Sequence, residues 1–228
     1  MINTNKRSEG FSLIELSIVL IIIGLLVAGV TGGAKLIKTA QLRNVISESR
    51  NYKMAVNAYY ALKDTIPGDD DNNGKIQDSN DAWGDLYTEK IISATPGSNK
   101  YMASKIKNAK WYIGYIDTLV DNSTESDIVI NANVATIAKS ITTPDTVVGL
   151  RAATVYFSGP DSLSLDTKLD DAKPYSGSVM AIGTTMANGA TTTTTCTERE
   201  ASKSEPTVAA TYSTNTGEVC ALTIKVDL

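Results

Sequence analysis

Residues 11–30 read FSLIELSIVLIIIGLLVAGV, and Glu15 is the one charged residue among them. A helix of about 20 residues spans roughly 30 Å, which is the thickness of the hydrocarbon core of a bilayer. Lys6 and Arg7 precede this apolar run, so the positive-inside bias keeps Met1 cytoplasmic and sends the later residues outward. The sequence therefore predicts a membrane-crossing helix followed by an exported domain.

Two other interpretations of the apolar run are a secretory signal peptide, cleaved near Ala28, and a plain single-span anchor. The run is longer than the 7 to 15 residues of a signal-peptide core, it contains a carboxylate, and a helical pattern continues beyond it. A plain anchor gives no reason to keep Glu15, because a charge near the middle of a membrane costs about 2.5 to 3.5 kcal/mol. We therefore expect Glu15 to have a partner.

The segment Gly10-Phe11-Ser12-Leu13-Ile14-Glu15-Leu16, behind its short basic leader, resembles the processing motif of type IV pilins and type II secretion pseudopilins. In that family a membrane peptidase cleaves after the glycine and methylates the new N-terminus. The resemblance thus implies cleavage between Gly10 and Phe11. A free α-amine has a pKa near 7.7 to 8.0 and is largely cationic at neutral pH, so Glu15 of one subunit can neutralise Phe11 of another.

The chain departs from this family at Gly32, where many pilins have a proline twenty-two residues into the mature chain. Gly33 follows it. Each glycine in a helix costs about 0.5 to 1 kcal/mol relative to alanine. We therefore expect a kink or a melted turn at this pair.

An amphipathic pattern continues from the glycines to Lys63 and stops before Pro67-Gly68. A soluble core helix would explain this part but not the apolar run before it. One long helix explains both parts. Its first half would lie in a membrane or filament core, and its second half would pack against a globular domain. The predicted apolar side contains Leu42, Val45, Ile46, Tyr52, Val56, Tyr59 and Tyr60, and the opposite side contains Lys38, Arg43, Glu48, Arg50 and Lys53.

The rest of the chain contains short alternating runs between turn residues, which is typical of strands. The predicted fold is α+β and type IV pilin-like, with a long N-terminal helix, transmembrane in its first half, packed against an antiparallel sheet. The expected strands begin near Trp111, Asp127, Arg151, Val179, Thr207 and Val219, and a helix begins at Asp161 or Ser162. The expected divisions are a cleaved leader (1–10), a transmembrane or filament-core helix (11–33), an amphipathic helix (34–66) and a β-rich head (67–228).

The composition argues against an enzyme and against a nucleic-acid-binding protein. The 228 residues include no histidine, which removes Ser-His-Asp and Cys-His hydrolysis, and no nucleophile constellation is visible. The formal net charge is -4, and no basic cluster is present that would follow a phosphate backbone.

Cys196 and Cys220 are the only cysteines. An exported domain meets an oxidising compartment, so we expect them to form a disulfide, which would stabilise the fold by about 3 kcal/mol. A cysteine-flanked C-terminal loop is also similar to the disulfide region of many type IV pilins. The spacing is not C-x-x-C, which argues against redox catalysis.

Residues 69–80 read DDDNNGKIQDSN and match the start of an EF-hand calcium loop in its oxygen ligands, its glycine and its isoleucine. The twelfth position is Asn80 where a bidentate glutamate is expected, although Asp78 and Asp81 are near enough to substitute. A solvated turn is the alternative, because loops favour the same residue types. Calcium is the one candidate cofactor, with candidate ligands Asp69, Asp71, Asn73, Lys75, Asp78 and Asp81.

Residues 165–174 read LDTKLDDAKP and resemble an Asp-x-Lys-x-Asp-Asp-Gly-x-Pro motif in the heads of some bacterial pilin-like proteins, with Ala172 in place of the glycine. We interpret this stretch as a helix end and turn. Asp166 and Asp170 lie one helical turn apart and have the spacing of an acid–base pair, but nothing nearby suggests a substrate and a solvated helix face is favoured. The Asn122-Ser123-Thr124 glycosylation pattern and the threonines 191–195 receive no function.

The predicted function is a structural subunit of a type IV pilus-like filament, stored in the inner membrane and extracted into a helical assembly. Head-to-tail packing that does not close generates such filaments. The resemblance implies three partners, namely prepilin peptidase, an inner-membrane assembly platform and further copies of this chain, and a head that is periplasmic and later extracellular. The alternatives are a type II secretion pseudopilin and a minor pilin or adhesin whose head binds a surface or DNA.

Overall fold

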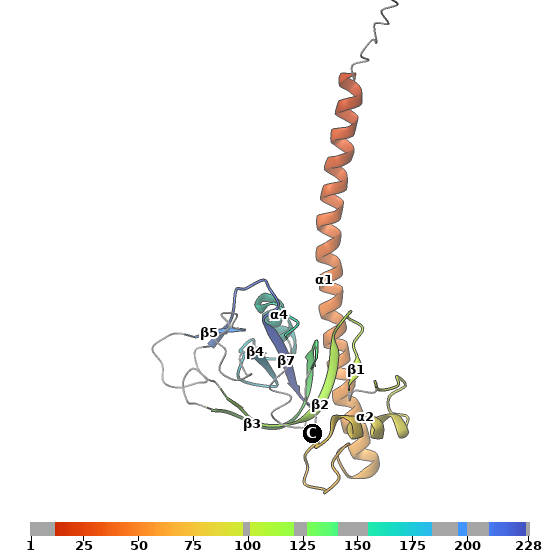
Figure 1. Cartoon of the computed structure of the whole chain (residues 1–228), viewed down its shortest axis with the longest axis vertical. Helices are drawn as coiled ribbons and strands as arrows, with labels where there is room; N and C mark the ends of the chain where they lie inside the picture. Colours follow the sequence, from red (N-terminus) through yellow and green to blue (C-terminus); the bar gives the residue numbers. More distant parts are fainter. Residues whose placement is uncertain are drawn as a thin grey trace, which may run out of the picture. The chain divides into compact units, whose positions relative to one another are not determined.

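The computed structural model describes residues 12–97, 101–120, 127–140, 155–183, 196–199 and 210–226 (Figure 1). The chain divides into two compact units, Met1–Gln41 and Leu42–Leu228. The helices of the described residues are α1 (Leu13–Lys63), α2 (Ser79–Thr88) and α4 (Gly159–Leu169). The strands are β1 (Met102–Ala103), β2 (Lys110–Val120), β3 (Asp127–Ala138), β4 (Val179–Gly183), β5 (Thr197–Arg199), β6 (Ala210–Tyr212) and β7 (Cys220–Lys225).

Helix α1 is continuous and ends at Lys63, as its pattern predicts. Asp64 follows in the left-handed conformation, with φ 58°, and its N–H donates to the carbonyl of Tyr60 at 2.8 Å. Gly32 and Gly33 both lie within the helix, so the melted turn expected at this pair is not formed. The hydrogen-bonded turns on either side propagate cooperatively and outweigh the small cost of each glycine.

A five-stranded antiparallel sheet in the order β1-β2-β3-β7-β4 forms the centre of the head, and β5 and β6 form a separate two-stranded sheet (Figure 1). The register pairs Trp111 with Ile137 and Val179 with Ile224. The C-terminal strand β7 therefore lies inside the sheet, between β3 and the edge strand β4. The predicted α+β class with an antiparallel sheet is confirmed.

The two faces of this sheet bury two different sets of side chains. Trp111 and Ile113 face the larger core, whereas Tyr112 between them faces the smaller one, as strand alternation requires. The helices contribute to the larger core through Val45, Val56 and Tyr59 of α1, Trp83 and Leu86 of α2, and Leu165 of α4.

Three local features differ from the sequence-based predictions. Helix α2 was not predicted. Helix α4 begins at Gly159 behind Ser158, whose Oγ accepts from the Asp161 amide, so the start expected at Asp161 or Ser162 is wrong by two or three residues. The strand expected from Arg151 is, in its described part, a single bridge between Phe157 and Cys220.

Glu48 was assigned to the charged side of α1, and this assignment is wrong. Its side chain is 5% exposed and accepts three hydrogen bonds, from Ser104 Oγ at 2.6 Å, the Lys105 amide at 2.7 Å and the Trp111 indole N–H at 2.9 Å. Hydrogen bonds to a carboxylate are stronger than those between neutral groups. Glu48 therefore ties this part of α1 to the segment that contains β1 and β2.

Tyr52, one turn further along α1, also contributes to the contact between α1 and the rest of the head. Its ring packs edge-on against Trp83 and Trp111, with centroid distances of 4.9 and 5.4 Å. Burial, and then the nearby charge of Glu48, raise the pKa of the Tyr52 hydroxyl. The hydroxyl therefore stays protonated at physiological pH.

Glu48→Gln should lower the free energy of unfolding by about 1 to 3 kcal/mol, because glutamine has one acceptor oxygen and leaves a buried donor unsatisfied. Lys53→Gln, at an exposed position of the same helix, should change it by less than about 0.5 kcal/mol. Urea unfolding of the full-length protein in detergent, followed by tryptophan fluorescence, measures both. Equal effects of the two substitutions would contradict the role given to Glu48.

Candidate assembly helix and acidic sites

The first turn of α1 contains Glu15, and the predicted cleavage residues Gly10 and Phe11 lie outside the described residues. Oε2 of Glu15 accepts from the Ser12 amide at 2.9 Å, and Oγ of Ser12 accepts from the Ile14 amide at 3.3 Å. Ser12-x-x-Glu15 is thus a capping box, in which two side chains satisfy amides at the helix start. The sequence contained this signal, but its interpretation considered only the charge of Glu15.

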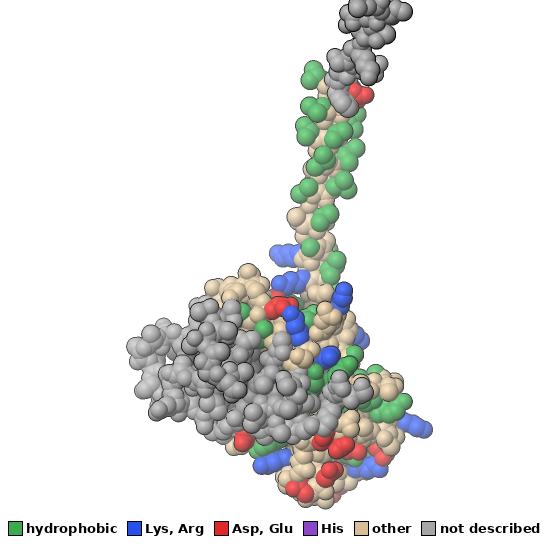
Figure 2. Space-filling view, viewed as in Figure 1, with side chains coloured by type: hydrophobic (Ala, Val, Ile, Leu, Met, Phe, Trp, Pro, Cys, Tyr) green, Lys and Arg blue, Asp and Glu red, His purple; other side chains and the backbone are tan. Residues whose placement is uncertain are grey.

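The apolar side chains of α1 between Leu13 and Val30 are exposed on every side of the helix. The exposed fraction of the leucine, isoleucine and valine residues in this stretch runs from 50% at Ile22 to 88% at Leu13. On the face drawn in Figure 2, hydrophobic side chains follow this part of α1 and no Lys or Arg lies among them. By length and composition the helix is able to cross a membrane.

The carboxylates of the EF-hand-like loop bond to the loop's own amides. Asp69 accepts from the amides of Asn73 at 3.0 Å and Gly74 at 2.7 Å, and Asp71 accepts from the side-chain amide of Asn73 at 2.9 Å. The amide of Lys75 donates to Asn73 Oδ1 at 2.9 Å. The structure thus brings together four of the six candidate calcium ligands.

The other two candidate ligands lie at the start of α2. Asp78 is the residue before the helix and caps it by accepting from the amides of Asn80 and Asp81. Asp81 lines a pocket together with Asp70 and Asp85, whereas Asp69 is not among the residues that line it. Calcium binding by the whole loop stays a prediction.

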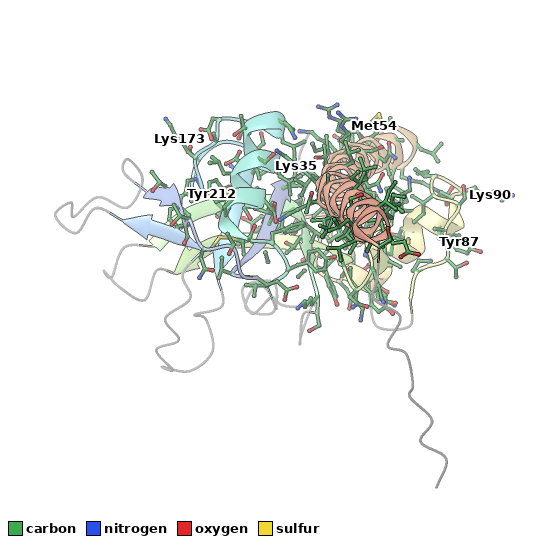
Figure 3. The ribbon with its side chains drawn as sticks, turned by 90° about the horizontal axis from the view of Figure 1, so that it is seen from above. Lys35, Met54, Tyr87, Lys90, Lys173 and Tyr212 are labelled. Carbon is green, nitrogen blue, oxygen red and sulfur yellow. A yellow bond between two sulfur atoms is a disulfide. The ribbon has the colours of Figure 1, made fainter. Side chains whose placement is uncertain are left out.

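The second acidic stretch is built differently. Asp166 is fully buried, and its Oδ2 accepts from the Tyr212 hydroxyl at 2.8 Å. The interpretation as a solvated helix face is therefore wrong for this residue. Figure 3 labels Tyr212, which reaches from β6. Burial raises the pKa of Asp166 to about 6, although the Tyr212 bond lowers it in part.

Asp170 and Asp171 shape the turn between α4 and β4. Asp170 Oδ2 accepts from the Ser178 and Val179 amides, and a Cβ on Gly177, which has φ 71°, would lie 1.7 Å from the same oxygen. Asp171 accepts from the Lys173 amide at 2.9 Å and from Ser176 Oγ at 2.5 Å. The Ser176 bond lowers the pKa of Asp171 most. Both carboxylates thus hold the turn through its amides and Ser176, and Gly177 leaves room for Asp170.

The C-terminal cysteines form a disulfide in the structure. Cys196 and Cys220 have Cα atoms 4.9 Å apart, and Cys220 is the first residue of β7. The disulfide joins β7, an interior strand of the main sheet, to the residue just before β5 of the small β5–β6 sheet.

The comparisons with known proteins concern the N-terminal part of the chain. Residues 5–31 match the family described as the prokaryotic N-terminal methylation motif. These residues carry a prepilin-type cleavage and methylation signature. The resemblance to type IV pilins and pseudopilins is thereby confirmed, and the apolar helix and the motif together fit a membrane-anchored protein of this type. No curated protein and no solved structure matches the chain.

Ala172→Gly should stabilise the head. Ala172 has φ 65°, a left-handed conformation that is unfavourable for residues with a Cβ. The glycine of the resembling motif would adopt it without strain. We expect the free energy of unfolding to rise by about 0.5 to 1 kcal/mol, measured by urea unfolding.

Ala58→Gly is the matched control, because Ala58 is exposed within α1, where glycine should cost about 0.5 to 1 kcal/mol. The two alanine-to-glycine substitutions should thus have opposite signs. Destabilisation by both would show that the turn does not strain Ala172.

Proposed function

We propose that this protein is a structural subunit of a type IV pilus-like filament. Residues 1–10 are the leader removed by prepilin peptidase, residues 11–33 cross the inner membrane and later line the filament core, residues 34–66 continue into the head, and residues 67–228 form it. The head is periplasmic while the subunit is stored and extracellular after an inner-membrane platform has assembled the filament.

The observation that carries this proposal is the uncovered apolar surface of α1. Full burial of a leucine, isoleucine or valine side chain contributes about 1.5 to 3 kcal/mol relative to exposure in water. Residues 13–30 include thirteen such side chains that are at least half exposed. Lipid covers them in a stored subunit, and the same helices of neighbouring copies cover them in a filament.

The motif also supports a way for a subunit to move from lipid into the filament core, because it supplies two charges of opposite sign. Cleavage after Gly10 gives Phe11 a free, methylated amine, which is cationic at neutral pH. Glu15 lies four residues further on and is the only acidic residue between Phe11 and Val30. An incoming Phe11 amine and a resident Glu15 carboxylate neutralise each other in the apolar core, where either charge alone would be costly.

A type II secretion pseudopilin is the second candidate, because the matched motif is shared by both kinds of filament subunit. The disulfide favours a pilus, since it places a cysteine-closed region at the C-terminal end of the head. Electron microscopy of cells with and without this chain distinguishes long surface pili from a periplasmic secretion filament.

Glu15→Val should leave membrane insertion intact but reduce filament yield at least tenfold, because each incoming Phe11 amine would enter the core unpaired. A lost partner in a buried ion pair costs about 3 to 5 kcal/mol. Glu15→Gln is the matched control for the capping box, because glutamine at this position also accepts from the Ser12 amide but carries no charge. Immunoblots of sheared filaments and of membranes report assembly and processing separately.

The proposal requires both variants to accumulate in the membrane and both to assemble poorly. Normal filament yield from Glu15→Gln would show that the cap, and not the charge, is needed. Normal yield from Glu15→Val would exclude both roles for this carboxylate.

A further inference from the structure

Three carboxylates converge where α4 ends. One oxygen from each of Asp166, Asp170 and Asp171 lies within 4.8 Å of the other two, and among the described residues this is the one such acidic group. Lys173 is the cation whose charge acts on Asp171. Besides the Ser176 bond, the Lys173 charge lowers the pKa of Asp171. Besides burial, the charges of Asp171 and Asp170 both raise the pKa of Asp166.

A buried oxygen without a partner provides a second observation, independent of the number of acidic groups. Asp166 is fully buried, and while its Oδ2 is held by Tyr212, its Oδ1 has no hydrogen-bond partner among the described residues. Leaving a buried polar atom unsatisfied costs about 1 to 3 kcal/mol, and more when the group is charged. Burial raises the pKa of Asp166 and the Ala172 amide is near enough to lower it in part, but this amide makes no hydrogen bond to Oδ1. Among the described residues, Oδ1 is therefore open to an added ligand.

We propose that Asp166, Asp170 and Asp171 bind a divalent cation of the size of calcium. Calcium takes about six to eight oxygen ligands at about 2.3 to 2.6 Å in a flexible geometry, and one oxygen from each carboxylate lies within 4.8 Å of the other two, so a single ion can contact all three. Magnesium demands a nearly ideal octahedron at about 2.0 to 2.1 Å and keeps several of its own waters, so three carboxylates at one helix end suit it less well. Oδ1 of Asp166 forms the buried side of the site, and the exposed Asp170 and Asp171 admit the ion.

The surrounding bonds hold these ligands in place for the ion. Oδ2 of Asp170 accepts from the Ser178 and Val179 amides. Its Oδ1 has no hydrogen bond to a described residue and can coordinate the ion. Asp171 is oriented by the Lys173 amide and Ser176 Oγ. Three carboxylates fall short of the six to eight ligands of calcium, so water completes the shell and the dissociation constant should be near 0.1 to 1 mM.

This site is separate from the EF-hand-like loop, whose Asp69 and Asp71 already bond to amides of their own turn. The two acidic segments can therefore be distinguished by matched aspartate-to-asparagine variants. Asp166→Asn removes a charge at the proposed site and retains an acceptor for Tyr212. Asp69→Asn removes a charge at the loop and serves as its control.

The experiment is thermal unfolding of the full-length protein in detergent at pH 7.5. Calcium chloride at 10 mM should raise the midpoint by about 3 to 5 °C over chelator, and magnesium should raise it less. The calcium shift should persist in Asp69→Asn and disappear in Asp166→Asn. Asp171→Asn, at an exposed position, provides a second test if Asp166→Asn does not fold.

A direct binding measurement supplements the melting curves. Terbium, which replaces calcium, should give luminescence sensitised by Tyr212, calcium should quench it, and Asp171→Asn should abolish it. The proposal is overturned if 10 mM calcium leaves the wild-type midpoint unchanged, if the shift survives in Asp166→Asn or Asp171→Asn, or if Asp69→Asn alone removes it.

Discussion

The bare apolar surface of α1 is the constraint on which the other properties of this protein depend. A helix whose leucine, isoleucine and valine side chains are exposed on all sides cannot stay in water, and the described residues contain no partner that covers residues 13–30. In the proposed function, lipid or neighbouring copies of the same helix cover it. That proposal gives a reason for the one carboxylate in the apolar run to stand near its start, four residues after the proposed new N-terminus at Phe11.

From Leu42 onward, the same helix is part of a folded head. Val45, Ala55, Val56 and Tyr59 are buried at helical spacing, and the Glu48 carboxylate binds three donors from the segment around β1 and β2. A buried carboxylate with three donors is well satisfied and rigid, whereas one oxygen of the Asp166 carboxylate has no hydrogen-bond partner in the part of the chain that the structure describes. The contrast separates a structural carboxylate from one suited to bind a ligand.

The sequence predicts the features that arise from local patterns. The apolar run, the amphipathic continuation to Lys63 and most strands are visible as periodicities, and Glu15 is conspicuous because a charge is rare in such a run. Glu48 and Asp166 could not be placed, because their decisive partners Trp111 and Tyr212 are 63 and 46 residues away. The start of helix α2 had a local signal, because Asp78 is a favourable N-cap residue. The helix was not predicted because Asp78 was assigned to the calcium loop instead.

Mass spectrometry of the N-terminus of the assembled protein tests the central claim most directly, because exchange from the membrane into a filament requires the new amine as the partner of Glu15. The account predicts a chain that begins at Phe11 and carries one methyl group on its α-amine. A chain that begins after Ala28, or that retains Met1 in assembled filaments, would contradict it.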